Sequence, residues 1–129
     1  MANDADVQGL GSVEGKGVEL VITLGTGMGS ALFLSDRLIP NIELPHHPFH
    51  KGKTYEECVG EGARKKLGDK KWNSRVKLAV RTLRHTFNYR MLYIGGGNAR
   101  RLKFDFPADV QLVSNLTGLL GGIALWRFD

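Results

Sequence analysis

The chain has 129 residues, a length that suits one domain with a hydrophobic core. Apolar residues make up 42% of it and charged residues 24%, which is ordinary for a folded protein, and no apolar run is long enough to span a membrane. The net charge of +5 favours anionic partners, either phosphate-rich small molecules or nucleic acid. A single cysteine, Cys58, excludes an internal disulfide and a multi-thiolate zinc site, and with an N-terminus unlike a signal peptide it predicts a cytoplasmic protein.

The first elements expected along the chain are strands. Residues 5–16 could form a short helix that its glycines weaken. The β-branched and apolar residues 18–24 predict a buried strand, and residues 30–34 predict a second one. After a turn and a short extended piece at 38–39, the proline- and histidine-rich residues 40–53 are expected to form an irregular loop.

Helices are expected next. Thr54 and Glu57 have the spacing of a capping box, which predicts a helix that continues to about Leu67 and stops at Gly68. A second helix is predicted over residues 70–88, because its apolar residues recur at helical spacing. They are Trp72, Val76, Ala79, Val80, Leu83 and Phe87.

The last third of the sequence alternates strands with helices. Strands are predicted over residues 91–94 and 110–113, with a short helix between them. A final helix is expected to begin after Asn115. Such alternation is typical of an α/β sheet covered by helices.

Three alternating glycines stand between the first two strands, at Gly25, Gly27 and Gly29. The spacing differs from the dinucleotide-binding fingerprint, and no Walker lysine follows. A glycine-rich hairpin with the hydroxyl of Thr26 can present backbone N–H groups to phosphate oxygens. A plain β-hairpin that needs positive φ is the alternative interpretation.

Other polar motifs have competing interpretations. Asp4 can cap a helix or act as a general base toward a substrate hydroxyl. Glu43 and His46 could bind a polyol, or could belong to a surface loop. The spacing of His46, His47 and His50 also raises zinc binding, although the further ligands that zinc needs are missing.

The segment "YIGGGNARR" places a glycine turn after a strand, so it predicts either an anion or nucleotide site or a bare turn.

Taken in order, the segments "NDAD", "TLGTGMGSALF", "PNIELPHH", "YIGGGNA" and "GLLGGIALW" resemble the ROK family of sugar kinases, and among them the bacterial polyphosphate/ATP glucokinases. The resemblance covers nearly the whole chain. It implies a ribonuclease H-like, actin/hexokinase-type ATPase fold. It also implies phosphoryl transfer from ATP or polyphosphate, with Mg²⁺, to a hexose such as glucose. The basic residues of the helix over 70–88 could attract polyphosphate, although a solvated charged face is the favoured interpretation.

The resemblance assigns roles to matching positions. Asp4 corresponds to the catalytic base. The sugar would contact Asn3, Glu43 and His46. The second phosphate loop would be Gly25, Thr26 and Gly27, and the nucleotide would lie beside Gly95, Gly96 and Gly97.

The sequence departs from the family pattern in two places. The Asp-x-Gly-Gly-Thr motif that opens the family's N-terminal lobe is missing, so residues 1–129 are expected to form a single domain, the C-terminal lobe, with little or no kinase activity alone. Pro45 replaces a family glycine and the family's cysteine cluster is missing, so no zinc is expected.

Two other functions stay open at this point. One is a non-catalytic sugar-binding or protein-interaction module, because the family includes transcriptional repressors. The other is a basic nucleic-acid-binding domain, which the core-like spacing of the aromatic residues disfavours. Surface left uncovered by a missing lobe predicts a homodimer, through residues 110–128.

Overall fold

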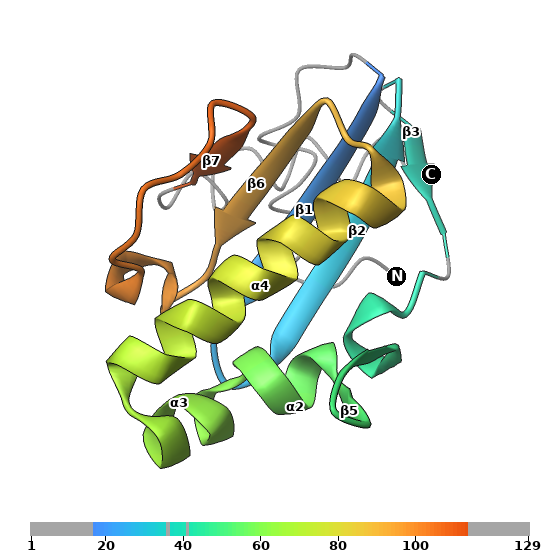
Figure 1. Cartoon of the computed structure of the whole chain (residues 1–129). Coiled ribbons are helices and arrows are strands. Elements are labelled where there is room, and N and C mark those ends of the chain that lie inside the picture. The colour runs from blue at the N-terminus through green and yellow to red at the C-terminus, as the bar shows by residue number, and fades with distance from the viewer. Residues whose placement is uncertain (1–16, 36, 41, 114–129) are drawn as a thin grey trace.

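The central element of the fold is a five-stranded mixed sheet with the order β3-β2-β1-β6-β7 (Figure 1). A computed structural model describes residues 17–35, 37–40 and 42–113. The strands are β1 (Val18–Leu24), β2 (Met28–Leu34), β3 (Arg37–Ile39), β6 (Met91–Gly95) and β7 (Val110–Leu112). The strands predicted at these places are confirmed, and β2 begins two residues earlier than expected.

Strand β1 lies at the centre of the sheet, and the two glycine segments, at residues 25–29 and 95–97, both lie beside its carboxyl end. It pairs antiparallel with β2 and parallel with β6, and Thr23 faces Gly29 on one side and Gly95 on the other. Because β1 and β6 are parallel, their carboxyl ends meet at one edge of the sheet. In Figure 1 both arrows point toward the end where α2 and α3 lie.

The helix predicted from Thr54 to Leu67 is in fact two helices, α2 (Tyr55–Val59) and α3 (Glu61–Leu67). The capping box is confirmed, since the side chains of Thr54 and Glu57 each accept the other's backbone N–H. The break occurs at Gly60, whose backbone is extended with ψ 174°. A Cβ at this position would lie 2.7 Å from the carbonyl oxygen of Glu56, so the chain turns sharply there.

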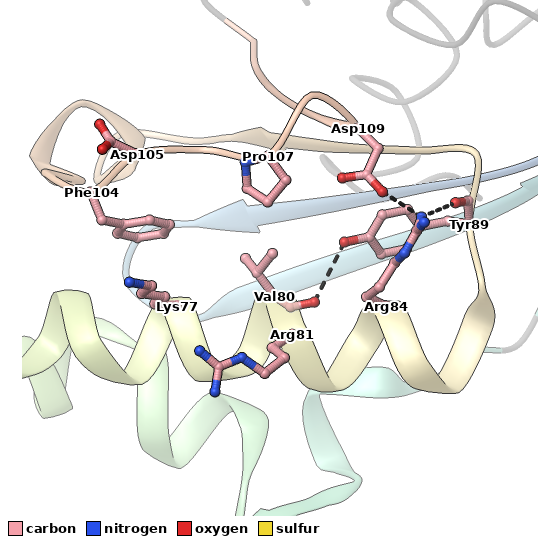
Figure 2. Close-up of a pocket in the computed structure, with 9 residues that line it drawn as sticks. All are labelled: Lys77, Val80, Arg81, Arg84, Tyr89, Phe104, Asp105, Pro107 and Asp109. Carbon is pink, nitrogen blue, oxygen red and sulfur yellow. Dashed lines mark hydrogen bonds and ion pairs between the residues drawn. The ribbon is translucent and has the colours of Figure 1, made fainter.

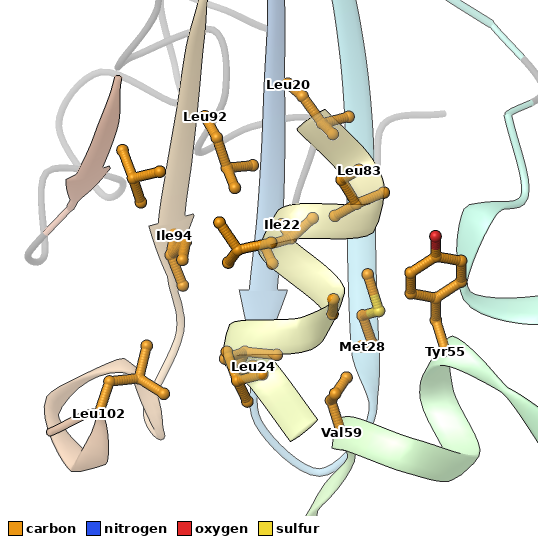
Figure 3. Close-up of a cluster of buried hydrophobic side chains, with 14 of the residues drawn as sticks. Leu20, Ile22, Leu24, Met28, Tyr55, Val59, Leu83, Leu92, Ile94 and Leu102 are labelled. Carbon is orange, nitrogen blue, oxygen red and sulfur yellow. The ribbon is translucent and has the colours of Figure 1, made fainter. Parts of the chain in front are cut away.

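Helix α4 (Asp69–Phe87) crosses one face of the sheet, as Figure 1 shows, and ends at Asn88 in the left-handed conformation. Its predicted apolar face is buried except for Phe87, which is only partly buried. Figure 3 shows side chains from β1, β6 and α4 meeting between helix and sheet, among them Leu20, Ile22, Leu83 and Leu92. This cluster is the main core.

A second, smaller cluster lies on the opposite face of the sheet. It contains Val21, Ala31, Phe33 and Tyr93, which alternate along their strands with residues of the main core. Both faces of the central strands are therefore buried, which explains why their sequences are apolar without clear alternation.

The loop predicted over residues 40–53 has more structure than expected. It contains a 3₁₀ turn, η1 (Leu44–His46), and a two-stranded ribbon of β4 (Pro48–His50) and β5 (Lys53–Thr54). Between β6 and β7 the predicted short helix is a single 3₁₀ turn, η2 (Ala99–Arg101).

The helices predicted over residues 5–16 and after Asn115 lie outside the described residues. Within the part of the chain that the structure describes, no helix combines the length and the hydrophobicity that a membrane span requires.

Candidate functional site

The turn between β1 and β2 consists of Gly25, Thr26 and Gly27. Its first N–H is used internally, because Gly25 donates to the carbonyl oxygen of Gly27 at 3.0 Å. The N–H of Met28 donates to a carboxylate oxygen of Glu56 at 3.2 Å. Among the described residues, none accepts a hydrogen bond from the N–H of Thr26 or Gly27. The turn thus offers two consecutive donors to an anion, fewer than a fully open loop would offer.

The glycines of this turn serve different steric needs. The turn does connect an antiparallel hairpin, but neither glycine has a positive φ, so the positive φ that the hairpin interpretation required is wrong. A Cβ on Gly27 would lie 2.7 Å from the Glu56 carboxylate, so glycine leaves room for that side chain. A Cβ on Gly25 would meet nothing within 4 Å. Packing within the described residues therefore does not explain why residue 25 is a glycine. Close approach of a ligand to the backbone would explain it.

The second glycine turn follows β6. Gly96 has φ +92°, and a Cβ there would lie 2.5 Å from the carbonyl oxygen of Leu24 and 2.7 Å from its nitrogen. Only glycine fits, because this turn packs directly on the end of β1. The N–H of Asn98 donates to the same Leu24 carbonyl at 2.9 Å. Gly97, in contrast, faces open space.

The two glycine turns are joined by a polar network around Asn98, which is buried. Its side-chain amide lies 3.4 Å from the carbonyl oxygen of Gly25 and donates to Glu61 at 3.0 Å. The N–H of Glu61 in turn donates to the carbonyl oxygen of Thr26 at 3.4 Å. The hydrogen bond from Asn98, and then the bond and charge of Arg64, hold the pKa of Glu61 below its ordinary value. The start of α3 and both turns therefore form one hydrogen-bonded unit.

Sequence reasoning did not find Glu56, Glu61 or Asn98. Their local signals are weak: Glu61 opens a helix, Glu56 lies inside one, and Asn98 follows a glycine run. Their contacts join residues 28 to 73 positions apart in sequence, so only the fold brings them together.

The predicted sugar contacts Glu43 and His46 share one 3₁₀ turn. The N–H of His46 donates to the Glu43 carbonyl at 3.1 Å, and the buried residues Leu44 and Pro45 anchor the turn in the core. Both polar side chains are exposed. The turn packs on β2 and α2, and α2 also carries Glu56 to the first glycine turn. The predicted residues Asn3 and Asp4 lie outside the described residues.

The zinc interpretation of the histidines finds no support in the described part of the chain, where no three His, Cys, Asp or Glu side chains are placed to hold a metal ion together. Cys58 is buried on α2, where it belongs to the main core.

Comparison with known proteins agrees with this arrangement. No family model matches the chain. The chain is 35% identical over 134 residues to a polyphosphate glucokinase of Mycobacterium tuberculosis, an alignment that includes 92% of this chain and 50% of that protein. Among solved structures, the chain resembles an inorganic polyphosphate/ATP-glucomannokinase from an Arthrobacter species, with 29% sequence identity. The two structures match with a TM-score of 0.77, over 96% of this chain and 54% of that one. The predicted resemblance to ROK sugar kinases of the polyphosphate glucokinase type is thereby confirmed.

The ROK fold extends to more distant proteins. A ROK glucokinase of Streptomyces griseus, solved with glucose and AMPPNP, matches the whole chain at 14% identity with a TM-score of 0.68, which shows a common fold. The predicted α/β fold of the actin/hexokinase ATPase type is thereby confirmed. The chain spans about half the length of the curated relatives it matches.

Proposed function

We propose that residues 1–129 form the C-terminal lobe of a ROK sugar kinase, which transfers a phosphoryl group from ATP or polyphosphate to a hexose such as glucose. The observation that supports this most is the meeting of two glycine turns at the carboxyl ends of β1 and β6, where the N–H groups of Thr26 and Gly27 have no acceptor among the described residues. A module that only bound sugar would not need this arrangement. The names of its relatives agree, since they are polyphosphate glucokinases.

The proposed reaction follows from phosphoryl-transfer chemistry. The N–H groups of Thr26 and Gly27, with the turn at residues 95–97, hold oxygens of the donor phosphates. Asp4 accepts the proton of the sugar hydroxyl as its oxygen bonds to phosphorus, and the bond from phosphorus to the leaving phosphate oxygen breaks. The sugar is oriented by Asn3, Glu43 and His46. Positioning and charge stabilisation supply most of the rate.

The residues present suit Mg²⁺ bound together with its donor. Mg²⁺ is usually held by one or two carboxylates and by substrate phosphates. Glu56 provides one carboxylate against the first glycine turn, at 3.2 Å from the N–H of Met28. When bound, Mg²⁺ would supply charge neutralisation on the donor phosphates. We propose no role for zinc.

The decisive experiment uses the open space at two glycines. Gly25→Ala and Gly97→Ala each add a methyl group where no atom of the described residues lies within 4 Å, so both variants should fold normally. If phosphates lie against these turns, the methyl group must block them. We expect each variant to bind tripolyphosphate at least about tenfold more weakly by isothermal titration calorimetry. Gly62→Ala, in open space on α3, is the matched control and should bind as the native chain does.

Unchanged tripolyphosphate affinity in both variants, with their melting temperatures intact, would refute the phosphate site. The sugar site is tested separately. Saturable glucose binding should be lost in Asp4→Ala, and the isolated chain should phosphorylate little or no glucose with ATP or polyphosphate. Clear turnover by the isolated chain would show that this lobe needs no partner lobe.

We also propose that the protein is a cytoplasmic homodimer. The predicted contact region, residues 110–128, lies mostly outside the described residues. Sedimentation velocity at several concentrations tests the dimer, and a single monomeric species at high concentration would refute it.

A further inference from the structure

Two adjoining hollows lie along the side of α4, beneath the segment that connects η2 to β7. One has a volume of about 350 Å³ and is shown in Figure 2. The other has a volume of about 410 Å³ and lies toward the start of α4. They share Lys77 and Phe104 in their walls, so together they form one elongated depression, which we call the α4 groove.

The α4 groove carries a row of cations. Lys70, Lys77 and Arg81 stand at positions i, i+7 and i+11 of the helix, which places them on one face over about 16 Å. Lys103 belongs to the facing segment. All four side chains belong to exposed residues, and none forms an ion pair with another described residue.

Most of the acidic side chains of the groove are already neutralised. Asp69 pairs with Arg64 at 2.8 Å, and Asp109 pairs with Arg84. Figure 2 shows the second pair at the end of the hollow, beside Tyr89. Asp105 remains as the one unpaired carboxylate among the described lining residues, against four unpaired cations. The α4 groove is therefore positively charged.

The floor of the groove is fixed by a buried amide. The side-chain nitrogen of Asn73 donates to the carbonyl oxygens of Asp69 at 2.8 Å and Arg101 at 3.1 Å, while its oxygen accepts the N–H of Lys103 at 2.5 Å. Asn73 is 8% exposed, so these bonds are shielded from water. They clamp the facing segment to α4 and hold the backbone of Lys103 at a set place beside the helix.

The groove leads to the glycine turns. The guanidinium of Arg101, two residues before Lys103, donates to the side-chain oxygen of Asn98 at 3.1 Å. Asn98 is the residue that joins the two turns through Gly25 and Glu61. The row of cations thus continues from the proposed phosphate site along the helix.

We infer that the α4 groove binds the trailing phosphates of an inorganic polyphosphate chain whose reacting end lies at the glycine turns. This inference rests on the proposed kinase function and specifies its donor. Cations spaced along a groove match a polymer with a negative charge on every unit, whereas a nucleotide concentrates its charge on one triphosphate. Nucleic acid would also need exposed aromatic rings for stacking, but Tyr89 is buried and Phe104 packs on Phe106 with ring centroids 4.7 Å apart.

The test compares two double charge reversals in the full chain. Lys77→Glu with Arg81→Glu changes the groove. Lys66→Glu with Lys71→Glu makes the same change in net charge at exposed positions outside its lining. Calorimetry with long-chain polyphosphate should show a loss of at least about tenfold for the groove variant and less than about twofold for the control. Circular dichroism and melting temperatures establish that both variants are folded.

Tripolyphosphate separates the inference from the function on which it rests. It is too short to follow the groove, so the groove variant should bind it within about twofold of the native chain, while Gly25→Ala should not. Equal losses of long-chain binding in both charge-reversed variants would overturn the inference, because net charge alone would then explain binding. The inference would also be overturned if single-stranded RNA bound as tightly as long-chain polyphosphate and lost as much affinity in the groove variant. The groove would then be a nucleic-acid surface. If Gly25→Ala binds tripolyphosphate normally but the groove variant still loses long-chain binding, the phosphate site fails. The placement of the reacting end at the glycine turns is then overturned, and only the binding of polyphosphate by the α4 groove stands.

Discussion

The side-chain amide of Asn98 donates a hydrogen bond to Glu61 at 3.0 Å, although the two residues are 37 positions apart in sequence. Asn98 is only 6% exposed, and the same amide also lies 3.4 Å from the carbonyl oxygen of Gly25. One buried side chain therefore sets the distance between α3, the first glycine turn and the second.

Replacing the Asn98 side chain should weaken the contacts among α3 and the two glycine turns. Asn98→Ala removes the buried amide and leaves its partners unsatisfied, which should lower the free energy of unfolding by about 1–3 kcal/mol, measured by urea titration. Asn98→Asp keeps the shape but places a second carboxylate beside Glu61. At pH 7 it should be less stable than Asn98→Ala, and it should recover as the pH falls. A stability of both variants equal to that of the native chain would contradict this role.

The pKa of Glu61 gives the network a pH dependence. Because the folded pKa lies below its ordinary value of 4.5, the folded state binds fewer protons than the unfolded state near that pH. The stabilisation is therefore complete above about pH 4.5 and is lost as the pH falls through the folded pKa. Urea titrations at a series of pH values should show that Glu61→Gln flattens the acid limb of the stability curve. An acid limb as steep in Glu61→Gln as in the native chain would contradict this assignment.

Regular elements could be predicted from the sequence because their signals are local. The burial of Trp72 and Leu83 on α4 follows from helical spacing, and the Thr54 capping box is confirmed. The break at Gly60 could not be predicted, because it depends on how α2 and α3 pack on α4 and on the carbonyl of Thr26. The structure also distinguishes two adjacent glycines that look alike in the sequence. Position 96 has no room for a side chain, whereas position 97 has room for one in the described part of the chain.

That distinction predicts opposite outcomes for neighbouring residues. Gly96→Ala puts a Cβ within 3 Å of the Leu24 backbone at φ +92°, so β1 and the turn must separate. We expect a loss of about 2 kcal/mol or more in the free energy of unfolding, which thermal denaturation would detect. In the described part of the chain no atom lies within 4 Å of the Cβ that Gly97→Ala would add, so this variant should melt within a few degrees of the native chain. Equal melting temperatures for the two variants would show that the turns are not in contact.

The capping box of α2 provides a stability test remote from the turns. Thr54→Ala removes the acceptor for the Glu57 N–H and should cost about 1 kcal/mol in the free energy of unfolding. The pKa of Glu57 is held below its ordinary value first by the backbone N–H of residue 54, which the variant keeps, and then by the Thr54 side chain. The variant should therefore raise this pKa only part of the way toward its ordinary value, which NMR titration would measure. Thr86→Ala, whose hydroxyl only donates back to the Thr82 carbonyl within α4, should change stability far less.

Glu56 connects helix α2 to the proposed phosphate site, and its charge can be removed without removing its hydrogen bond. In Glu56→Gln the amide oxygen can still accept the N–H of Met28, so the turn should keep its shape. Loss of a negative charge beside the N–H groups of Thr26 and Gly27 should strengthen the binding of metal-free tripolyphosphate several-fold. The same change should reduce the gain in affinity that Mg²⁺ provides, because one carboxylate ligand is lost. Calorimetry with and without Mg²⁺ measures both effects, and Glu57→Gln on the exposed side of α2 should show neither.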